Sequence, residues 1–265
     1  MSNNSIIDRN RAKQTLRAGQ SVTGTILIEI RQPAVMQLLA NAGFDFVIID
    51  NEHGAFNIET IADLSRTAKY VGLTPLVRVP DMTYPHIAQS LDAGAQGVVI
   101  PRIYNPDQVR EAVQITRYPP QGMRGNALTR GYTNFKSGVV SEVMAAVNQE
   151  TLLIIQIETR QALDSVDDIV SIPGVDAAFI GPNDLSIALG LPGQIDNPEV
   201  EAAIEATIAA CQRHHVIPCI HMNDLKLAVH WAQKGMRLVS VGSEAGLLMW
   251  RGREVTATMG QAFGR

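Results

Sequence analysis

The sequence predicts an α/β protein of the (β/α)8 barrel (TIM barrel) class, on the basis of three observations. Short apolar runs rich in Ile and Val alternate with helix-like stretches along the chain. The chain has 265 residues, which is the usual size of one such barrel. No linker or low-complexity stretch divides it. We therefore expect a single barrel domain over residues 1–265.

Eight runs are predicted as strands because they are short and rich in β-branched or other apolar residues. In order they are Val22–Ile30, Phe44–Asp50, Thr74–Val79, Gly97–Pro101, Leu152–Glu158, Ala177–Gly181, Val216–Ile220 and Leu238–Gly242. The helix-like stretches between them include Ile58–Val71, Tyr84–Ala93, Asp107–Arg117, Gln161–Ser171, Pro198–His214 and Asp224–Lys234. Several strands are preceded by a turn with glycine, such as NAGFD at 41–45, and glycine is a common helix stop.

The longest irregular region is Tyr118–Lys136, which leads into the fifth predicted strand. A loop that enters a barrel strand lies at the bottom of the barrel unless it crosses over. We expect either a lid or subunit contact, or a plain excursion of the chain.

Composition and charge exclude several classes of partner. The formal net charge of −4 gives no electrostatic reason to expect nucleic acid or an acidic membrane. No apolar stretch approaches the roughly 20 residues of a membrane helix, and the polar N-terminus lacks the apolar core of a signal peptide. Cys211 and Cys219 show no metal or redox spacing, so we expect reduced, buried thiols. The sequence predicts a soluble, cytoplasmic protein.

Two carboxylates follow consecutive predicted strands and form the first candidate site. Glu158 closes the run LLIIQIE, and Asp184 ends the run AAFIGPND. Parallel strands joined by a crossover helix place both C-terminal ends on one edge of the sheet. The pair is therefore expected to converge and to suit Mg²⁺ or Mn²⁺. The alternative is a solvated Glu158 and a helix N-cap at Asp184.

Residues beside this acidic pair are candidates for binding the substrate. A predicted helix begins at the turn of Gly181, Pro182 and Asn183. The backbone N–H groups of this turn can bind a substrate carboxylate. Gln156 lies two residues before Glu158 on the same predicted strand. These four residues are the expected substrate contacts near the metal.

The second and third predicted strands end in a further polar group. His53 follows a strand end within the sequence DNEH and has a pKa suited to a general base, with Asp50 or Glu52 to orient it. A structural histidine is the alternative. Arg78 is an inward cation in the apolar run LVRVP, so it needs an anionic partner, either a protein carboxylate or a substrate oxyanion. His221, after the seventh strand, has no evident partner in the sequence.

Two mechanisms lack the residues that they require. None of the five lysines ends a predicted strand, which disfavours a Schiff-base mechanism. No G-x-G-x-x-G follows the first strand, so a dinucleotide site has no support.

At these residues the chain resembles the HpcH/HpaI aldolase family of phosphoenolpyruvate/pyruvate-type barrels. The resemblance runs in order and spacing over roughly residues 20 to 250. The matching pieces are GFDFVIIDNEH, LVRVP, LDAGAQGVVIPR, RYPPQGMRG, QIETRQAL and GVDAAFIGPNDLS.

The resemblance implies roles for particular residues. Glu158 and Asp184 are implied to hold a divalent cation (Mg²⁺, Mn²⁺ or Co²⁺) that chelates a 2-oxo acid and stabilises its enolate. Arg78 is implied to stabilise the enolate oxygen, and His53 to take part in proton transfer. Asp92 is implied to reach the site of a neighbouring subunit.

The resemblance also implies a homohexamer in which the last helix, within Ser243–Phe263, is exchanged between partners. The chain departs from the usual pattern at His221, at Glu29 and Arg31, and in the stretch after Arg124. These positions are expected to face the aldehyde half of the substrate.

The expected function is that of a class II aldolase. It would reversibly cleave a 4-hydroxy-2-oxo acid, through a metal-bound enolate, into pyruvate or hydroxypyruvate and an aldehyde. One alternative is a citrate-type or acyl-CoA-type lyase or synthase of the same superfamily. Another is a non-catalytic sensor of 2-oxo acids.

Overall fold

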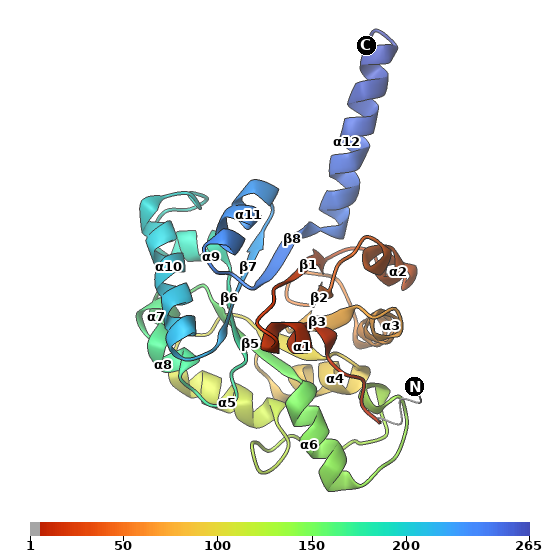
Figure 1. Ribbon diagram of the computed structural model, residues 1–265, viewed down its shortest axis with the longest axis vertical. Helices are drawn as coiled ribbons and strands as arrows, with labels where there is room; N and C mark the ends of the chain where they lie inside the picture. Colours follow the sequence, from red (N-terminus) through yellow and green to blue (C-terminus); the bar gives the residue numbers. More distant parts are fainter. Residues whose placement is uncertain (1–5) are drawn as a thin grey trace.

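The computed structural model describes residues 6–265, and within them eight parallel strands close into one barrel surrounded by helices (Figure 1). The predicted fold class is confirmed, since each strand pairs with the next and β8 pairs with β1. The strands are β1 (Val22–Leu27), β2 (Phe46–Asp50), β3 (Thr74–Arg78), β4 (Gly97–Ile100), β5 (Leu152–Ile157), β6 (Ala177–Ile180), β7 (Ile217–Met222) and β8 (Leu238–Ser243).

Helices follow the strands and cover the outside of the barrel. They are α1 (Arg11–Arg17), α2 (Ala34–Asn41), α3 (Ile58–Tyr70), α4 (Tyr84–Ala93), α5 (Pro106–Thr116), the 3₁₀ turn η1 (Gly131–Thr133), α6 (Val140–Glu150), α7 (Arg160–Asp164), α8 (Val166–Val170), α9 (Pro182–Ala188), α10 (Pro198–Arg213), α11 (Leu225–Gln233) and α12 (Glu244–Ala262).

Most predicted elements have bounds within one or two residues of those in the structure, and two larger differences have identifiable reasons. The single helix predicted over Gln161–Ser171 is two short helices, because Ser165 has a non-helical ψ of 20° and its hydroxyl donates to the Gln161 carbonyl. The first strand ends at Leu27 rather than Ile30. Beyond that point the backbone N–H groups bind the carboxylate of Glu244, so they leave the ladder.

Strand side chains alternate between the barrel interior and the helical layer. Phe46 and Ile48 of β2 pack in the interior, whereas Val47 and Ile49 pack against the helices. Gly24 of β1 leaves room for this interior packing, since an added Cβ would lie 2.5 Å from the Phe46 ring. By the same alternation, the side chains at strand ends that come two residues after an interior residue point into the barrel mouth.

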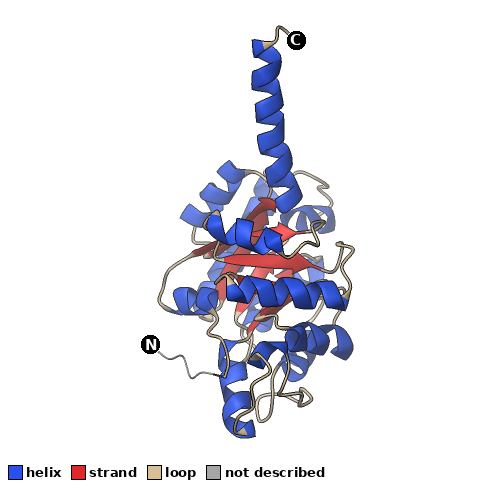
Figure 2. Ribbon diagram, turned by 90° about the vertical axis from the view of Figure 1, so that its right-hand side faces the viewer, coloured by secondary structure: helices blue, strands red, loops and turns tan. Residues whose placement is uncertain are grey.

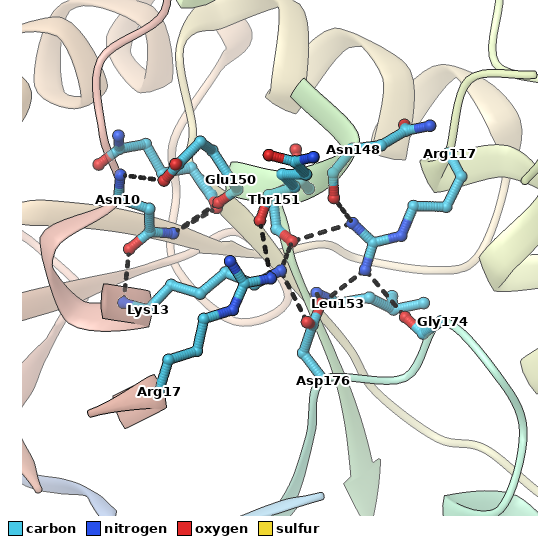
Figure 3. Close-up of polar contacts among 12 residues, drawn as sticks. Asn10, Lys13, Arg17, Arg117, Asn148, Glu150, Thr151, Leu153, Gly174 and Asp176 are labelled. Atoms are coloured by element: carbon cyan, nitrogen blue, oxygen red, sulfur yellow. Dashed lines mark hydrogen bonds and ion pairs between the residues drawn. The ribbon is translucent and has the colours of Figure 1, made fainter. Parts of the chain in front are cut away.

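The bottom of the barrel is closed by α1 and a buried polar cluster (Figure 3). Lys13 Nζ lies 2.6 Å from Asp176 Oδ1, and Arg117 Nη2 lies 2.5 Å from Asp176 Oδ2. Arg117 also donates to the backbone carbonyls of Asn148 and Thr151, at 2.9 Å each. Burial alone would raise the pKa of Asp176, but Lys13 and Arg117 lower it below its ordinary value. The cluster ties the N-terminal helix to the strands above it.

The loop 118–139 packs at this bottom end, as expected for a segment that enters a strand. The guanidinium carbon of Arg124 lies 4.8 Å from the ring centroid of Tyr118 and 5.2 Å from that of Tyr132. The two tyrosine hydroxyls are 2.9 Å apart. Figure 2 shows this end of the molecule opposite to the C-terminal helix.

Helix α12 begins at the rim and extends away from the barrel for 19 residues (Figures 1 and 2). Only Glu244 of this helix is buried. Its exposed apolar side chains are Leu248, Met249, Trp250, Val255 and Met259. Within residues 6–265, no helix is both long enough and apolar enough to cross a membrane.

Candidate active site at the barrel mouth

Glu158 is a buried carboxylate at the end of β5. Its side chain is held by two donors: the backbone N–H of Arg102, at 2.7 Å from Oε1, and the amide of Gln156, on Oε2. The residue is only 6% exposed, so the alternative of a solvated glutamate is wrong. Gly181, which follows the neighbouring strand β6, leaves space here, because an added Cβ would lie 3.1 Å from Glu158 Oε2.

Asp184 faces the same cavity as Glu158 from the first turn of α9. Gly181 occupies the N-cap of this helix and Asp184 is its third residue, so the N-cap alternative for Asp184 is also wrong. Burial first, and then the charges of Asp184 and Glu52, raise the pKa of Glu158, although the Arg102 N–H acts in the opposite direction. A cation between the two carboxylates would relieve this repulsion.

The donor set fits a divalent cation with open coordination positions. The amide nitrogen of Gln156 contacts Glu158. The amide oxygen, Oε1, is buried and has no hydrogen-bond partner. Within residues 6–265, no three or more His, Cys, Asp or Glu side chains gather as a ligand set. Two carboxylates, with water or substrate oxygens in the other positions, match the coordination of Mg²⁺ and Mn²⁺.

Arg78 forms a two-point ion pair with Asp50 across β2 and β3. Its Nε and Nη2 lie 2.9 Å and 2.6 Å from the two carboxylate oxygens, and Nη1 lies 3.2 Å from Glu52. Burial alone would lower the pKa of Arg78, but the two carboxylates raise it overall. Two anionic partners were predicted for Arg78, a protein carboxylate or a substrate oxyanion. In the folded chain, Asp50 and Glu52 provide the protein carboxylates. Arg78 also lines a cavity at the barrel mouth.

His53 lies on the loop after β2 with its ring largely in solvent. The side chain is 66% exposed, and Nε2 lies 3.9 Å from Glu52 Oε2. Asp50 contacts the backbone of this loop rather than the ring, since its Oδ1 accepts the N–H groups of Glu52 and His53. Of the two residues expected to orient His53, Glu52 is thus beside the ring, and Asp50 shapes the turn that carries it.

Two cavities meet at His53 and Asp184. The barrel-mouth cavity has a volume of about 260 Å³ and is lined by Ile26, Ile28, Asp50, His53, Arg78, Gln156, Phe179, Gly181, Pro182, Asn183, Asp184, His221, Asn223 and Ser243. The lateral cavity, about 440 Å³, is lined by Glu52, His53, Arg102, Tyr104, Glu158, Thr159, Arg160, Gln161, Asp184, Ile187 and Ala188. All the candidate site residues except Asp92 line one or both of them.

Asp92 does not join the mouth of its own barrel. It lies in the last turn of α4, where its Oδ1 accepts from Arg124 Nη2 at 2.6 Å. Arg124 belongs to the bottom loop, so Asp92 lies at the opposite end from the cavities. Its expected contact with a neighbouring subunit's site stays a prediction.

Two residues at the mouth have structural roles that the sequence did not reveal. Arg102 adopts φ 56°, a conformation that non-glycine residues rarely take, and in doing so it directs its N–H at Glu158. Glu244 accepts the backbone N–H groups of Ile28, Glu29 and Ile30 at 3.0, 2.7 and 2.9 Å. Neither feature has a sequence signal, because backbone angles and distant partners set both.

Comparison with known proteins places the chain among related sequences and structures. Residues 26–249 match the model of the HpcH/HpaI aldolase/citrate lyase family. The chain is 38% identical over 253 residues, 94% of each chain, to the 4-hydroxy-2-oxo-heptane-1,7-dioate aldolase of Salmonella paratyphi C. It is 36% identical over 255 residues, 95% of each, to the enzyme of the same name from Escherichia coli.

Solved structures show the same architecture. An HpcH/HpaI aldolase from Desulfitobacterium hafniense DCB-2 superposes with a TM-score of 0.90 at 32% identity, covering 94% of this chain and 96% of that one. The citrate synthase SbnG superposes with a TM-score of 0.87 at 28% identity, covering 97% and 100%.

Proposed function

Because the chain belongs to the HpcH/HpaI aldolase/citrate lyase family, we propose that it is a divalent-metal-dependent class II aldolase. It reversibly cleaves a 4-hydroxy-2-oxo acid into pyruvate, or hydroxypyruvate, and an aldehyde. The observation that carries the proposal is the position of Glu158. This buried carboxylate shares a cavity with Asp184, and that cavity meets the one that holds the Arg78–Asp50 pair.

The residues of the mouth supply complementary parts of the reaction. Glu158 and Asp184 would hold the divalent cation, which would supply Lewis acidity toward the 2-oxo oxygen. Arg78 faces the barrel-mouth cavity and stabilises negative charge that develops on that oxygen. Asp50 and Glu52 fix the direction of the guanidinium through three contacts.

In the cleavage direction, His53 moves the proton of the C4 hydroxyl. As that proton leaves, the C3–C4 bond breaks, the aldehyde carbonyl forms, and the electron pair of the broken bond passes to the enolate of the oxo acid. Protonation at C3 then gives pyruvate. The exposed ring of His53 makes a relay through water compatible with its position. The turn of Gly181, Pro182 and Asn183 and the amide of Gln156 contact the oxo acid.

Proton exchange of pyruvate in deuterated buffer tests this proposal without knowledge of the aldehyde. We expect the methyl signal in the proton NMR spectrum to disappear with Mg²⁺, Mn²⁺ or Co²⁺ and to persist after treatment with EDTA. Glu158→Gln is expected to abolish exchange, and borohydride is expected to trap no pyruvate adduct. Exchange that survives both EDTA and Glu158→Gln contradicts the metal role. Metal-dependent pyruvate binding without exchange supports the sensor instead.

A citrate-type or acyl-CoA-type reaction is the second candidate, supported by the similarity to SbnG. The described lining of the two cavities contains arginines but no lysine. Formation of citrate, or turnover of an acyl-CoA ester, together with failure to release an aldehyde from any 4-hydroxy-2-oxo acid, favours this candidate.

The proposal includes a homo-oligomer, hexameric as in the resemblance, in which α12 packs on a neighbouring copy. The exposed apolar side chains of α12 support it, since most of this helix projects away from the barrel. Light scattering coupled to size exclusion measures the mass. A monomeric mass at micromolar concentration contradicts the proposal. We also propose a cytoplasmic location, which the two buried, unpaired cysteines support.

A further inference from the structure

His221 is a half-buried histidine at the barrel mouth, and the proposed reaction assigns it no role. It lies on β7, where Cys219 packs inside the barrel and Ile220 and Met222 pack outside. The alternation therefore turns His221 inward, and it lines the barrel-mouth cavity beside Asn223. This position is fixed by the strand rather than by a mobile loop.

The ring of His221 is held by its neighbours. Nδ1 lies 3.0 Å from the hydroxyl of Ser240, which is its register partner on β8 and is fully buried. Burial is the largest cause that lowers the pKa of His221, to about 4, while a hydrogen bond with Asn223 acts against it. The imidazole is thus neutral near pH 7, with one nitrogen that donates and one that accepts. A neutral imidazole can form a hydrogen bond with a hydroxyl group of a substrate.

The position of His221 relative to the oxo acid indicates which half of the substrate it meets. The proposed contacts of the oxo acid come from β5, β6 and the β2–β3 pair: Gln156, Glu158, Gly181, Asp184 and Arg78. The part of the lining of the same cavity that comes from β1, β7 and β8 consists of Ile26, Ile28, His221, Asn223 and Ser243. Arg78 and His221 both line this one cavity.

We propose that His221 and Asn223 form the subsite for a hydroxyl group on the aldehyde half of the substrate. The preferred aldehyde is therefore a hydroxyaldehyde rather than an aliphatic one. The inference rests on the proposed aldolase function and adds its substrate class. His221 and Asn223 place polar groups in this part of the lining beside Ile26 and Ile28, so an aldehyde with a hydroxyl gains a hydrogen bond here that an aliphatic one cannot make.

The test compares two aldehydes of similar size, glycolaldehyde and propanal, as acceptors of pyruvate with the metal-loaded protein. We expect the unaltered protein to prefer glycolaldehyde in kcat/KM by about 100-fold, less than a fully enclosed hydroxyl site gives, because Asn223 is exposed. His221→Leu is expected to reduce this preference to within about threefold while activity with propanal is kept or raised. His221→Gln, which retains a donor and an acceptor, is expected to restore part of the preference.

Controls separate this proposal from the reaction itself and from folding. His214→Leu makes the same change on the exposed end of α10 and is expected to leave the preference unaltered. Pyruvate proton exchange measures the aldolase proposal independently, and it is expected to persist in His221→Leu. If His221→Leu does not fold, the preference between the two aldehydes is measured in Asn223→Ala instead. An unchanged preference in the folded variant, or an equal loss with both aldehydes, overturns the subsite.

Discussion

The backbone N–H of Arg102 donates a 2.7 Å hydrogen bond to Oε1 of Glu158, from a residue with φ 56°. The left-handed conformation at the end of β4 thus points a backbone donor at the carboxylate that follows β5. The backbone of Arg102, and not its exposed side chain, positions the candidate metal ligand.

We therefore expect opposite results from two substitutions of Arg102. Arg102→Gly removes the side chain but adopts the same φ freely, so Mn²⁺ affinity is expected to stay within about twofold of the original. Arg102→Val strains the backbone by about 1–3 kcal/mol and is expected to weaken Mn²⁺ binding about tenfold. Titration calorimetry measures both. Equal affinities in the two variants would show that the backbone geometry has no part in metal binding.

Arg78→Lys tests the two-point contact with Asp50. Lysine keeps the charge but cannot contact both carboxylate oxygens in the same plane. We expect the rate of pyruvate proton exchange to fall by about 10²-fold or more, as when an oxyanion donor is displaced. Arg110→Lys, in an exposed ion pair on α5, is the matched control and is expected to leave the exchange rate unchanged. An unchanged exchange rate in Arg78→Lys would show that the reaction requires only the positive charge at this position and not the two-point contact.

Asp176→Asn is expected to lower the stability of the barrel. The substitution leaves Lys13 and Arg117 buried without their carboxylate, and breaking such a buried pair costs about 3–5 kcal/mol. Urea denaturation measures the free energy of unfolding. Asp167→Asn, which breaks an exposed ion pair with Arg213, is the control and is expected to change nothing measurable. Similar stabilities of the two variants would refute the structural role of the cluster.

His221 is expected to make stability depend on pH. Its pKa is about 4 in the folded chain and about 6.5 unfolded, so between these values the unfolded chain binds more protons. Stability from this residue is complete above pH 6.5 and decreases as the pH falls toward 4, by about 3 kcal/mol in total. In EDTA-treated protein, the difference in unfolding free energy between pH 7 and pH 4 is expected to be smaller in His221→Leu. Parallel pH profiles would exclude a buried, neutral histidine.

The sequence allowed the barrel and the acidic pair to be predicted because both follow from local patterns. Short apolar runs mark strands, and a carboxylate just after such a run must lie at the mouth of a parallel barrel. Glu158, Asp184 and Asp50 line the cavities at this mouth, as these patterns predict. The same alternation explains why Arg78 and His221 point inward.

Other features depend on partners that are distant in sequence. Nothing near Lys13 indicates that Asp176 neutralises it, and nothing near Ile28 indicates that Glu244 ends β1. The helix predicted over Gln161–Ser171 has a suitable composition, yet a serine hydroxyl bond divides it. Asp92 lies within a motif of the resemblance, but its place at the bottom of the barrel follows only from the fold.

The projecting helix α12 links the folding of one chain to the number of chains present. Helices in proteins draw most of their stability from tertiary packing, and only the first residue of α12 is buried against its own barrel. If a second copy supplies the missing contacts, the helical content measured by circular dichroism will decrease on dilution, and the melting temperature will decrease with it. Dilution would then melt this helix before it affects the barrel.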